Sequence, residues 1–142
     1  MLHISQSPEQ TAEIAAEFAK TLQPGDVVTL NGDLGVGKTA FVQGLAKALG
    51  ITDYISSPTF TIVNCYEAET PLYHFDVYRI ADPEEMYEIG YEEYINGDGI
   101  CIIEWAELIA DILPEERYDV TIRKNYDVDE NYREIEIEKK ES

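Results

Sequence analysis

One glycine-rich run carries the clearest chemical signal in this sequence. Gly32-Asp33-Leu34-Gly35-Val36-Gly37-Lys38-Thr39 matches the pattern G-x-x-x-x-G-K-[ST] in full. In this pattern, glycines let the backbone curl so that successive N–H groups point at phosphate oxygens, and the following helix N-terminus adds positive potential. The lysine reaches the β- and γ-phosphates, and the hydroxyl at the last position ligates Mg²⁺. The motif therefore predicts a site for a purine nucleoside triphosphate, with ATP and Mg²⁺ expected; a tight turn without a ligand is the alternative.

A P-loop site also needs an acidic side chain near the metal, usually at the end of an apolar strand. Glu104 follows the apolar run Ile100–Ile103, and Asp76 follows Leu72–Phe75. The carboxyl ends of parallel strands gather on the side of the sheet where phosphates bind. The run before Glu104 is the more uniformly apolar, so Glu104 is the better candidate for the metal, directly or through water. Asp76 could position water or the metal from the side, and either acid could instead simply face solvent.

Two further features have open interpretations. The segment Ser57-Pro58-Thr59-Phe60-Thr61 could be a switch-like loop whose hydroxyls reach a γ-phosphate, or merely a turn that opens a strand. Trp105, the single tryptophan, could pack on the nucleotide, line a partner surface or belong to the core.

The elements that must position these residues follow from hydrophobic periodicity and turn signals. Ser7-Pro8-Glu9-Gln10 has the form of a helix start with a capping box, and Ile14, Phe18 and Leu22 then share one helical face. Helices are expected from Ser7 to the Pro24-Gly25-Asp26 turn, over Thr39–Leu49 and over Pro83–Ile89. Strands are expected over Val27–Leu30, Phe60–Tyr66, Leu72–Asp76 and Ile100–Ile103, and two edge strands of a closing hairpin over Val120–Lys124 and Arg133–Ile137. The pattern predicts one α/β domain over residues 1–142: a P-loop NTPase-type domain with a mixed, mainly parallel central sheet, flanking helices and a C-terminal β-hairpin.

Charge and composition limit the classes of partner. The chain has 142 residues, with 10 Lys and Arg against 29 Asp and Glu, so its formal net charge is −19. Such a surface repels phosphate backbones, so general nucleic-acid binding is not expected, and a nucleotide site must create its own local positive potential. Cys65 and Cys101 lie in strand-like runs and are expected to be reduced core thiols. No secretory signal or membrane span is apparent, so the cytoplasm is the expected location.

The chain resembles the TsaE family, small bacterial P-loop ATPases required for tRNA threonylcarbamoyladenosine biosynthesis. The resemblance covers nearly the whole chain, and its pieces stand in the family's order and spacing. These pieces are the glycine-rich run, Ser57-Pro58-Thr59-Phe60-Thr61, His74-Phe75-Asp76-Val77-Tyr78-Arg79 and Ile103-Glu104-Trp105. The first piece alone indicates only nucleotide binding, whereas the four together are specific to this family.

The resemblance implies an activity, partners and site residues. TsaE proteins bind ATP with Mg²⁺, hydrolyse it slowly alone, and associate with TsaB and TsaD. TsaD transfers a threonylcarbamoyl group to an adenosine beside the anticodon, and ATP hydrolysis by TsaE resets that complex. By position, the implied nucleotide-binding residues are Leu34, Gly35, Val36, Gly37, Lys38, Thr39, Thr59, Trp105 and Arg133. Thr39 and Glu104 are implied to hold Mg²⁺, and Lys38, Asp76 and Glu104 to be the catalytic residues.

Two other classes of function remain as alternatives. A small-molecule kinase would need an acceptor pocket and a basic lid, and this chain is short and has no basic lid segment. A non-catalytic nucleotide-sensing module would change its partner surface on ATP binding alone. Slow intrinsic hydrolysis is physically reasonable, because fast hydrolysis needs a well-placed arginine or water-orienting residue, and none of the four arginines lies in the P-loop. We therefore expect TsaB and TsaD to complete the site.

Overall fold

A seven-stranded sheet organises the chain. The computed structural model describes residues 1–32, 36–52, 63–78, 80–125 and 127–141. The strands are β1 (Leu2–Ser5), β2 (Val27–Asn31), β3 (Val63–Tyr66), β4 (Leu72–Asp76), β5 (Ile100–Glu104), β6 (Arg117–Lys124) and β7 (Arg133–Lys140). The helices are α1 (Pro8–Ala19), α2 (Lys38–Ala48), α3 (Glu85–Glu88), α4 (Tyr91–Ile95) and the 3₁₀ segment η1 (Ala106–Ile112).

The sheet has a parallel centre and antiparallel margins. Its strand order is β1-β7-β6-β2-β5-β4-β3. β2 pairs in parallel with both β5 and β6, and β4 pairs in parallel with β5. The pairs β1–β7, β6–β7 and β3–β4 are antiparallel. This arrangement confirms the predicted α/β class with a mixed sheet, flanking helices and a C-terminal hairpin.

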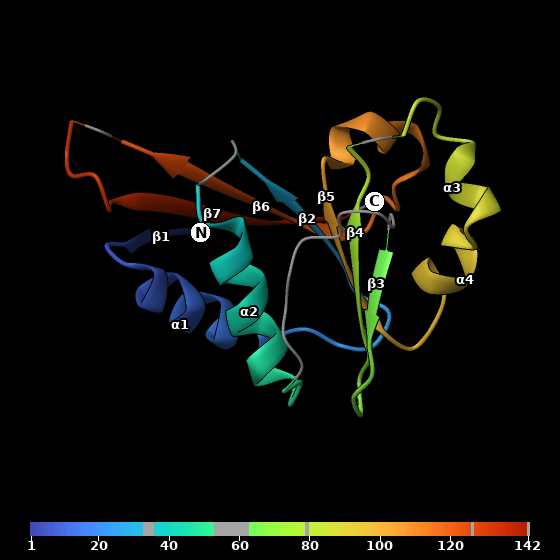
Figure 1. The fold of residues 1–142 in the computed structure, drawn as a ribbon, viewed down its shortest axis with the longest axis horizontal. Helices are drawn as coiled ribbons and strands as arrows, with labels where there is room; N and C mark the ends of the chain where they lie inside the picture. Colours follow the sequence, from blue (N-terminus) through green and yellow to red (C-terminus); the bar gives the residue numbers. More distant parts are fainter. Residues whose placement is uncertain (33–35, 53–62, 79, 126, 142) are drawn as a thin grey trace.

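Helices cover the two faces of the sheet in separate pairs. Figure 1 shows α1 and α2 side by side on one side of the sheet and α3 and α4 on the other. The first face packs α1 and α2 on apolar side chains that alternate along the central strands, among them Leu30, Ile102 and Val120. The opposite face packs Phe75 and Ile103 with α3, α4 and η1. Alternation along the central strands therefore divides their apolar side chains between two clusters, one on each face of the sheet.

The start of α1 follows its sequence signals with one shift. Ser7 is the N-cap, and its hydroxyl accepts a hydrogen bond from the Gln10 N–H at 3.1 Å, as predicted. The Gln10 side chain, however, accepts from the N–H of Gln6 at 2.6 Å instead of that of Ser7. Ile14 and Phe18 face the core as expected. Two side chains therefore cap the first turn of α1. The arrangement differs from a standard capping box only in that Gln10 accepts from the residue before the N-cap.

The contact between α1 and α2 depends on a glycine in the middle of α2. A Cβ placed on Gly44 would lie only 2.2 Å from the carbonyl oxygen of Ala12 in α1. The two helix backbones therefore approach more closely at this point than any side chain would allow. Helix α2 begins at the end of the glycine-rich run, so this crossing fixes the helix that follows that run.

The structure corrects two predictions. The strands of the C-terminal hairpin are not edge strands: β6 lies between β2 and β7, and β7 lies between β6 and β1. The N-terminal strand β1, which the sequence pattern did not indicate, forms that edge instead. Cys65 is exposed and not a core thiol, whereas Cys101 is buried, as predicted, and both are free.

The helices of this chain are short. Within the described part of the chain, no helix combines the length and the apolar character needed to cross a bilayer.

Candidate functional site

The described part of the P-loop joins the end of β2 to the start of α2. Gly37 is the N-cap of α2 and has φ 110°, a conformation that side-chain-bearing residues rarely adopt, so glycine is required there. Lys38 is the first residue of the helix, and the exposed Thr39 follows it. Val36 is buried, while Leu34 and Gly35 lie outside the described residues. The structure thus confirms the strand-to-helix setting that the motif requires.

Lys38 points back toward the sheet and meets Glu104. The Lys38 Nζ lies 3.6 Å from Glu104 Oε1, and the two side chains are only 8% and 6% exposed. The same ammonium group lies 4.9 Å from the centre of the Trp105 ring, on its face. The cation is therefore held by a carboxylate and by an aromatic face. The structure brings Lys38, Glu104 and Trp105 together as the sequence predicted.

The acids lie where the parallel strands end. Glu104 is opposite Leu30 of β2 on one side and opposite Asp76 of β4 on the other. Figure 1 shows these three strands running in the same direction, toward the side of the sheet where the P-loop and η1 begin. Asp76 is half-buried, and its Oδ1 accepts a hydrogen bond from the N–H of Tyr78 at 3.1 Å. Burial raises the pKa of Asp76, and the nearby Glu104 carboxylate adds to the rise.

His74 completes this group, although the sequence reasoning gave it no role. Its Nε2 lies 2.5 Å from Glu104 Oε2, and its side chain is 1% exposed. Because side chains alternate along a strand, His74 and Asp76 share the face that carries Glu104. The spacing of a histidine two residues before the strand-end acid was the signal that could have indicated it.

Trp105 occupies a strained position directly after Glu104. Its φ is 63° and its ψ 33°, in the left-handed region, and it is the only non-glycine residue with positive φ in the described part of the chain. Its ring packs against that of the exposed Tyr78, with centroids 4.9 Å apart. Strained backbone of this kind is concentrated at functional sites. The sharp turn at the end of β5 is what places the indole beside Lys38.

Arg133 links the C-terminal hairpin to the P-loop. Its Nε donates to the carbonyl oxygen of Val36 at 2.8 Å, and its Nη1 donates to the carbonyl oxygens of Glu130 and Tyr132. A small cavity of about 80 Å³ lies beside this contact. Its lining residues come from α1, the P-loop helix and the hairpin: Ser7, Pro8, Thr11, Val36, Gly37, Ala40, Asn131 and Arg133. The structure therefore places Arg133 against the P-loop, whereas Thr59 lies outside the described residues.

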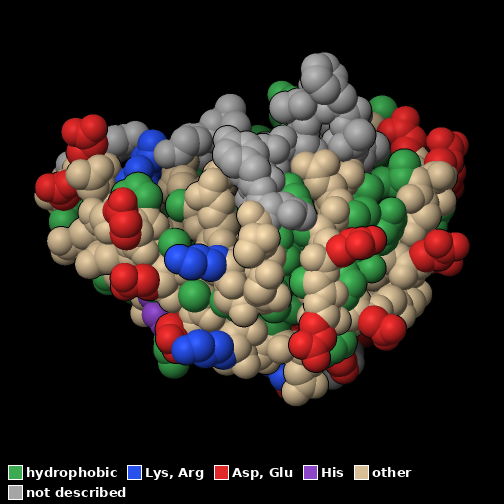
Figure 2. All heavy atoms as spheres, turned by 60° about the horizontal axis from the view of Figure 1, so that its bottom comes forward, with side chains coloured by type: hydrophobic (Ala, Val, Ile, Leu, Met, Phe, Trp, Pro, Cys, Tyr) green, Lys and Arg blue, Asp and Glu red, His purple; other side chains and the backbone are tan. Residues whose placement is uncertain are grey.

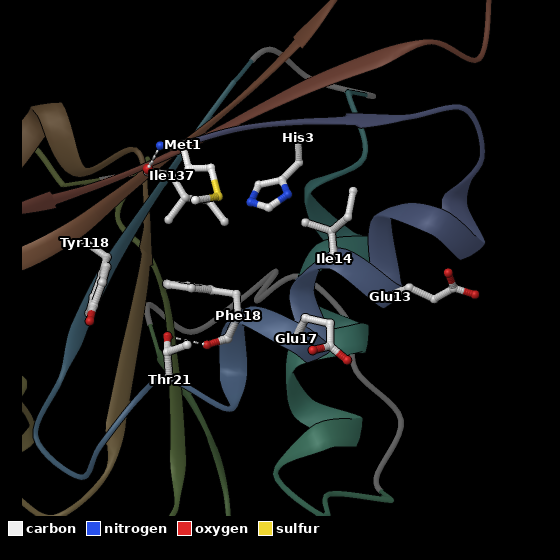
Figure 3. A pocket seen from close by; sticks show the side chains of 9 residues that line it. All are labelled: Met1, His3, Glu13, Ile14, Glu17, Phe18, Thr21, Tyr118 and Ile137. Carbon is white, nitrogen blue, oxygen red and sulfur yellow. Dashed lines mark hydrogen bonds between the residues drawn. The ribbon is translucent and has the colours of Figure 1, made fainter.

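A second cavity, of about 500 Å³, lies in a different part of the molecule. Figure 3 shows its lining side chains between α1 and the strands β1, β6 and β7: Met1, His3, Glu13, Ile14, Glu17, Phe18, Thr21, Tyr118 and Ile137. These residues are mainly apolar, and they include two carboxylates but no lysine or arginine. Such a lining does not suit a polyphosphate, so the P-loop region is the nucleotide-site candidate.

The protein surface is mostly negative, so a phosphate-binding site needs positive potential of its own. Figure 2 shows Asp and Glu side chains spread over the visible face, with few Lys and Arg between them. Against a net charge of −19, Lys38 and the backbone N–H groups at the start of α2 provide local positive potential that can attract phosphate.

Comparison with known proteins gives a consistent result. The family model described as "Threonylcarbamoyl adenosine biosynthesis protein TsaE" matches residues 5–135. The tRNA threonylcarbamoyladenosine biosynthesis protein TsaE of Bacillus subtilis is 50% identical over 119 residues, which are 83% of this chain and 74% of that protein. The protein of the same name from Treponema pallidum is 46% identical over 134 residues, or 94% of this chain and 97% of that protein.

A solved structure agrees with the sequence relatives. The crystal structure of Bacillus subtilis YdiB superposes with a TM-score of 0.80 at 42% sequence identity and covers 95% of this chain and 82% of that chain. With the family model spanning most of the chain and the P-loop, acid and tryptophan placed as described, the chain belongs to the TsaE family.

Proposed function

We propose that this protein is a Mg²⁺-dependent ATPase that hydrolyses ATP slowly on its own and acts with TsaB and TsaD in forming threonylcarbamoyladenosine in tRNA. Its ATP cycle would reset the TsaB–TsaD complex between turnovers. The names of its relatives support the pathway. The observation that carries the nucleotide chemistry is the buried contact of Lys38 with Glu104, beside the P-loop and at the ends of β2 and β5.

The residues present fit a nucleotide with Mg²⁺. Lys38 would turn from Glu104 to the β- and γ-phosphates, which carry more charge than one carboxylate. The α2 N-terminus would donate backbone N–H groups to the phosphates. Thr39 and Glu104 would hold Mg²⁺, which supplies charge neutralisation on the phosphate oxygens. Mg²⁺ in such sites is bound by one or two protein ligands together with phosphate oxygens and water.

The remaining site residues would orient the nucleotide and water. Asp76, which lies next to Glu104 and has a raised pKa, would hold water near the metal. Trp105 would release Lys38 and become free to contact the nucleotide. Arg133 would keep the P-loop backbone in place through Val36.

The charge and two of the arginines support dependence on a partner. Arg117 is engaged by Asp119 and the Pro114 carbonyl, and Arg133 by backbone carbonyls. These two arginines are already engaged, which supports the proposal that a partner supplies a group that stabilises charge on the transferring phosphate. A surface at −19 favours contact with the proteins TsaB and TsaD over a direct grip on tRNA.

The test is ATP turnover by the purified protein, alone and with TsaB and TsaD. We expect slow turnover that changes with the partners and disappears in Lys38→Met. Lys47→Ala, an exposed lysine in the same helix, is the matched control and should behave as wild type. Turnover that ignores the partners would refute the coupling.

Glu104→Gln separates turnover from sensing. If pathway function in cells requires ATP hydrolysis, cells with the Glu104→Gln variant should lose pathway function, although the variant still binds nucleotide. Pathway function that survives without hydrolysis would favour the nucleotide-sensing module. A phosphorylated metabolite in a substrate screen would favour the kinase.

A further inference from the structure

His74 is a buried polar side chain that the proposed ATPase does not use. It lies in β4 opposite Ile102 of β5, two residues before the Asp76–Glu104 pair. Side chains at this spacing on neighbouring parallel strands lie diagonally across the same sheet face. His74 is thus presented to Glu104 by rigid backbone on both sides and not by a loop.

The two oxygens of Glu104 have different partners. Oε1 faces Lys38 Nζ at 3.6 Å, and Oε2 lies 2.5 Å from His74 Nε2. All three side chains are less than a tenth exposed. The carboxylate plane is therefore fixed from two directions, and one of its two partners, Lys38, is the group expected to leave when phosphate binds.

The other ring nitrogen of His74 identifies the tautomer. Nδ1 is buried and has no hydrogen-bond partner among the described residues. A proton on Nδ1 would be a buried hydrogen-bond donor without an acceptor, and the short contact between Nε2 and Oε2 requires a proton between these two atoms. We therefore assign the ring proton to Nε2, which donates to Glu104.

We propose that His74 is a positioning residue that holds Glu104 in the orientation needed to bind the metal. The proposal rests on the proposed Mg²⁺-dependent nucleotide site. With Oε2 held by His74, the carboxylate stays in place when Lys38 moves to the phosphates, and Oε1 is left facing the site. Hydrogen-bonded neighbours of this kind commonly change metal affinity or activity by about 10–100-fold when removed.

The test compares variants that differ in where a side-chain donor sits. The amide nitrogen of glutamine can take the place of Nε2, whereas that of the shorter asparagine falls near Nδ1. We expect His74→Leu and His74→Asn to raise the Mn²⁺ concentration that half-saturates the ADP-bound protein by about 10–100-fold. His74→Gln should recover most of that loss. His3→Leu, the same change at the chain's other histidine, is the control.

Two readouts are independent of turnover. Electron paramagnetic resonance measures Mn²⁺ bound in the presence of ADP, and calorimetry measures ADP affinity in EDTA. The variants should differ in the first and stay close to wild type in the second, which also shows that they are folded. Imidazole ¹⁵N spectra of the wild type should show the Nε2–H tautomer for His74.

The outcomes separate the two proposals. If wild-type Mn²⁺ binding does not respond to ADP, the proposed metal–nucleotide site fails, and this inference fails with it. If wild type responds but His74→Leu binds Mn²⁺ as tightly, only the positioning role is overturned. Equal weakening in His74→Gln and His74→Asn, or an Nδ1–H tautomer, would likewise overturn it.

Discussion

Lys38 and Glu104 should stabilise each other before any nucleotide binds. Lys38→Met keeps an unbranched stem and removes the charge, and Glu104→Gln keeps an oxygen that can accept from His74. Each single change leaves the other charge buried at a site where the two side chains are 8% and 6% exposed. We expect Lys38→Met to lower the free energy of unfolding by about 3 kcal/mol, the low end for breaking a buried pair, because His74 still donates to Glu104.

The magnitude of the coupling follows from the distance. At 3.6 Å and an effective dielectric constant of about 20, the attraction is about 4–5 kcal/mol. The desolvation penalty of each group cancels in a double-mutant cycle, but the surroundings relax around the remaining charge in each single variant, so we expect a measured coupling of about 2 kcal/mol, within the range found for groups in contact. The double variant should therefore be more stable than the sum of the single changes predicts.

The assay is equilibrium urea denaturation followed by circular dichroism, in EDTA and without nucleotide. Lys20 and Glu17 provide the control cycle, because they form an ion pair at 3.0 Å but are 69% and 73% exposed. That exposed pair should show a coupling below about 0.5 kcal/mol. A Lys38–Glu104 coupling no larger than that of the control would refute the view that the two site charges neutralise each other in the free protein.

Three further outcomes are expected. Gly44→Ala should destabilise the protein by about 2 kcal/mol or more in urea denaturation, because the helix-propensity gain is smaller than the cost of moving two backbones apart; the exposed neighbour Gln43→Ala should change little, and equal stability of the two variants would contradict the close crossing. A thiol reagent should modify one cysteine per native chain, the exposed Cys65, and two in denaturant, because Cys101 is buried and its pKa is raised to about 12; modification of two in the native state would refute this. Because the pKa of Asp76 is raised on folding, its contribution to stability is present at low pH and lost as pH rises through the folded pKa. Asp76→Asn should therefore raise the free energy of unfolding at pH 7 relative to wild type, and this gain in stability should shrink toward pH 4. A gain that grows toward low pH would contradict a raised pKa of Asp76 in the folded protein.

Local signals predicted the elements well, because each depends on neighbouring residues. The cap at Ser7, the apolar run of β5 and the glycine before α2 all act within a few positions of the chain. The P-loop motif likewise carries its own strand-to-helix context. Lys38 and Glu104 could therefore be named from sequence, and the structure brings them together.

Long-range pairing was the part that sequence did not reveal. The alternation of charged and apolar residues over positions 133–138 is typical of an edge strand, yet β1 pairs with the outer side of β7. β1 is only four residues long and contains His3 and Ser5, so it carries no strong strand signal. The contact of His74 with Glu104 crosses two strands diagonally, and such a contact requires the sheet register.

The order of strands in the sheet has a consequence for how the protein is synthesised. β2 carries the P-loop, but its two neighbours, β5 and β6, come much later in the chain. Arg133, which binds the P-loop carbonyl of Val36, follows that residue by 97 positions. A growing chain therefore displays the whole motif long before it has a sheet to hold it or an acid to face it. A chain cut short before Ile100 would contain the motif but lack Glu104 and both strands that flank β2.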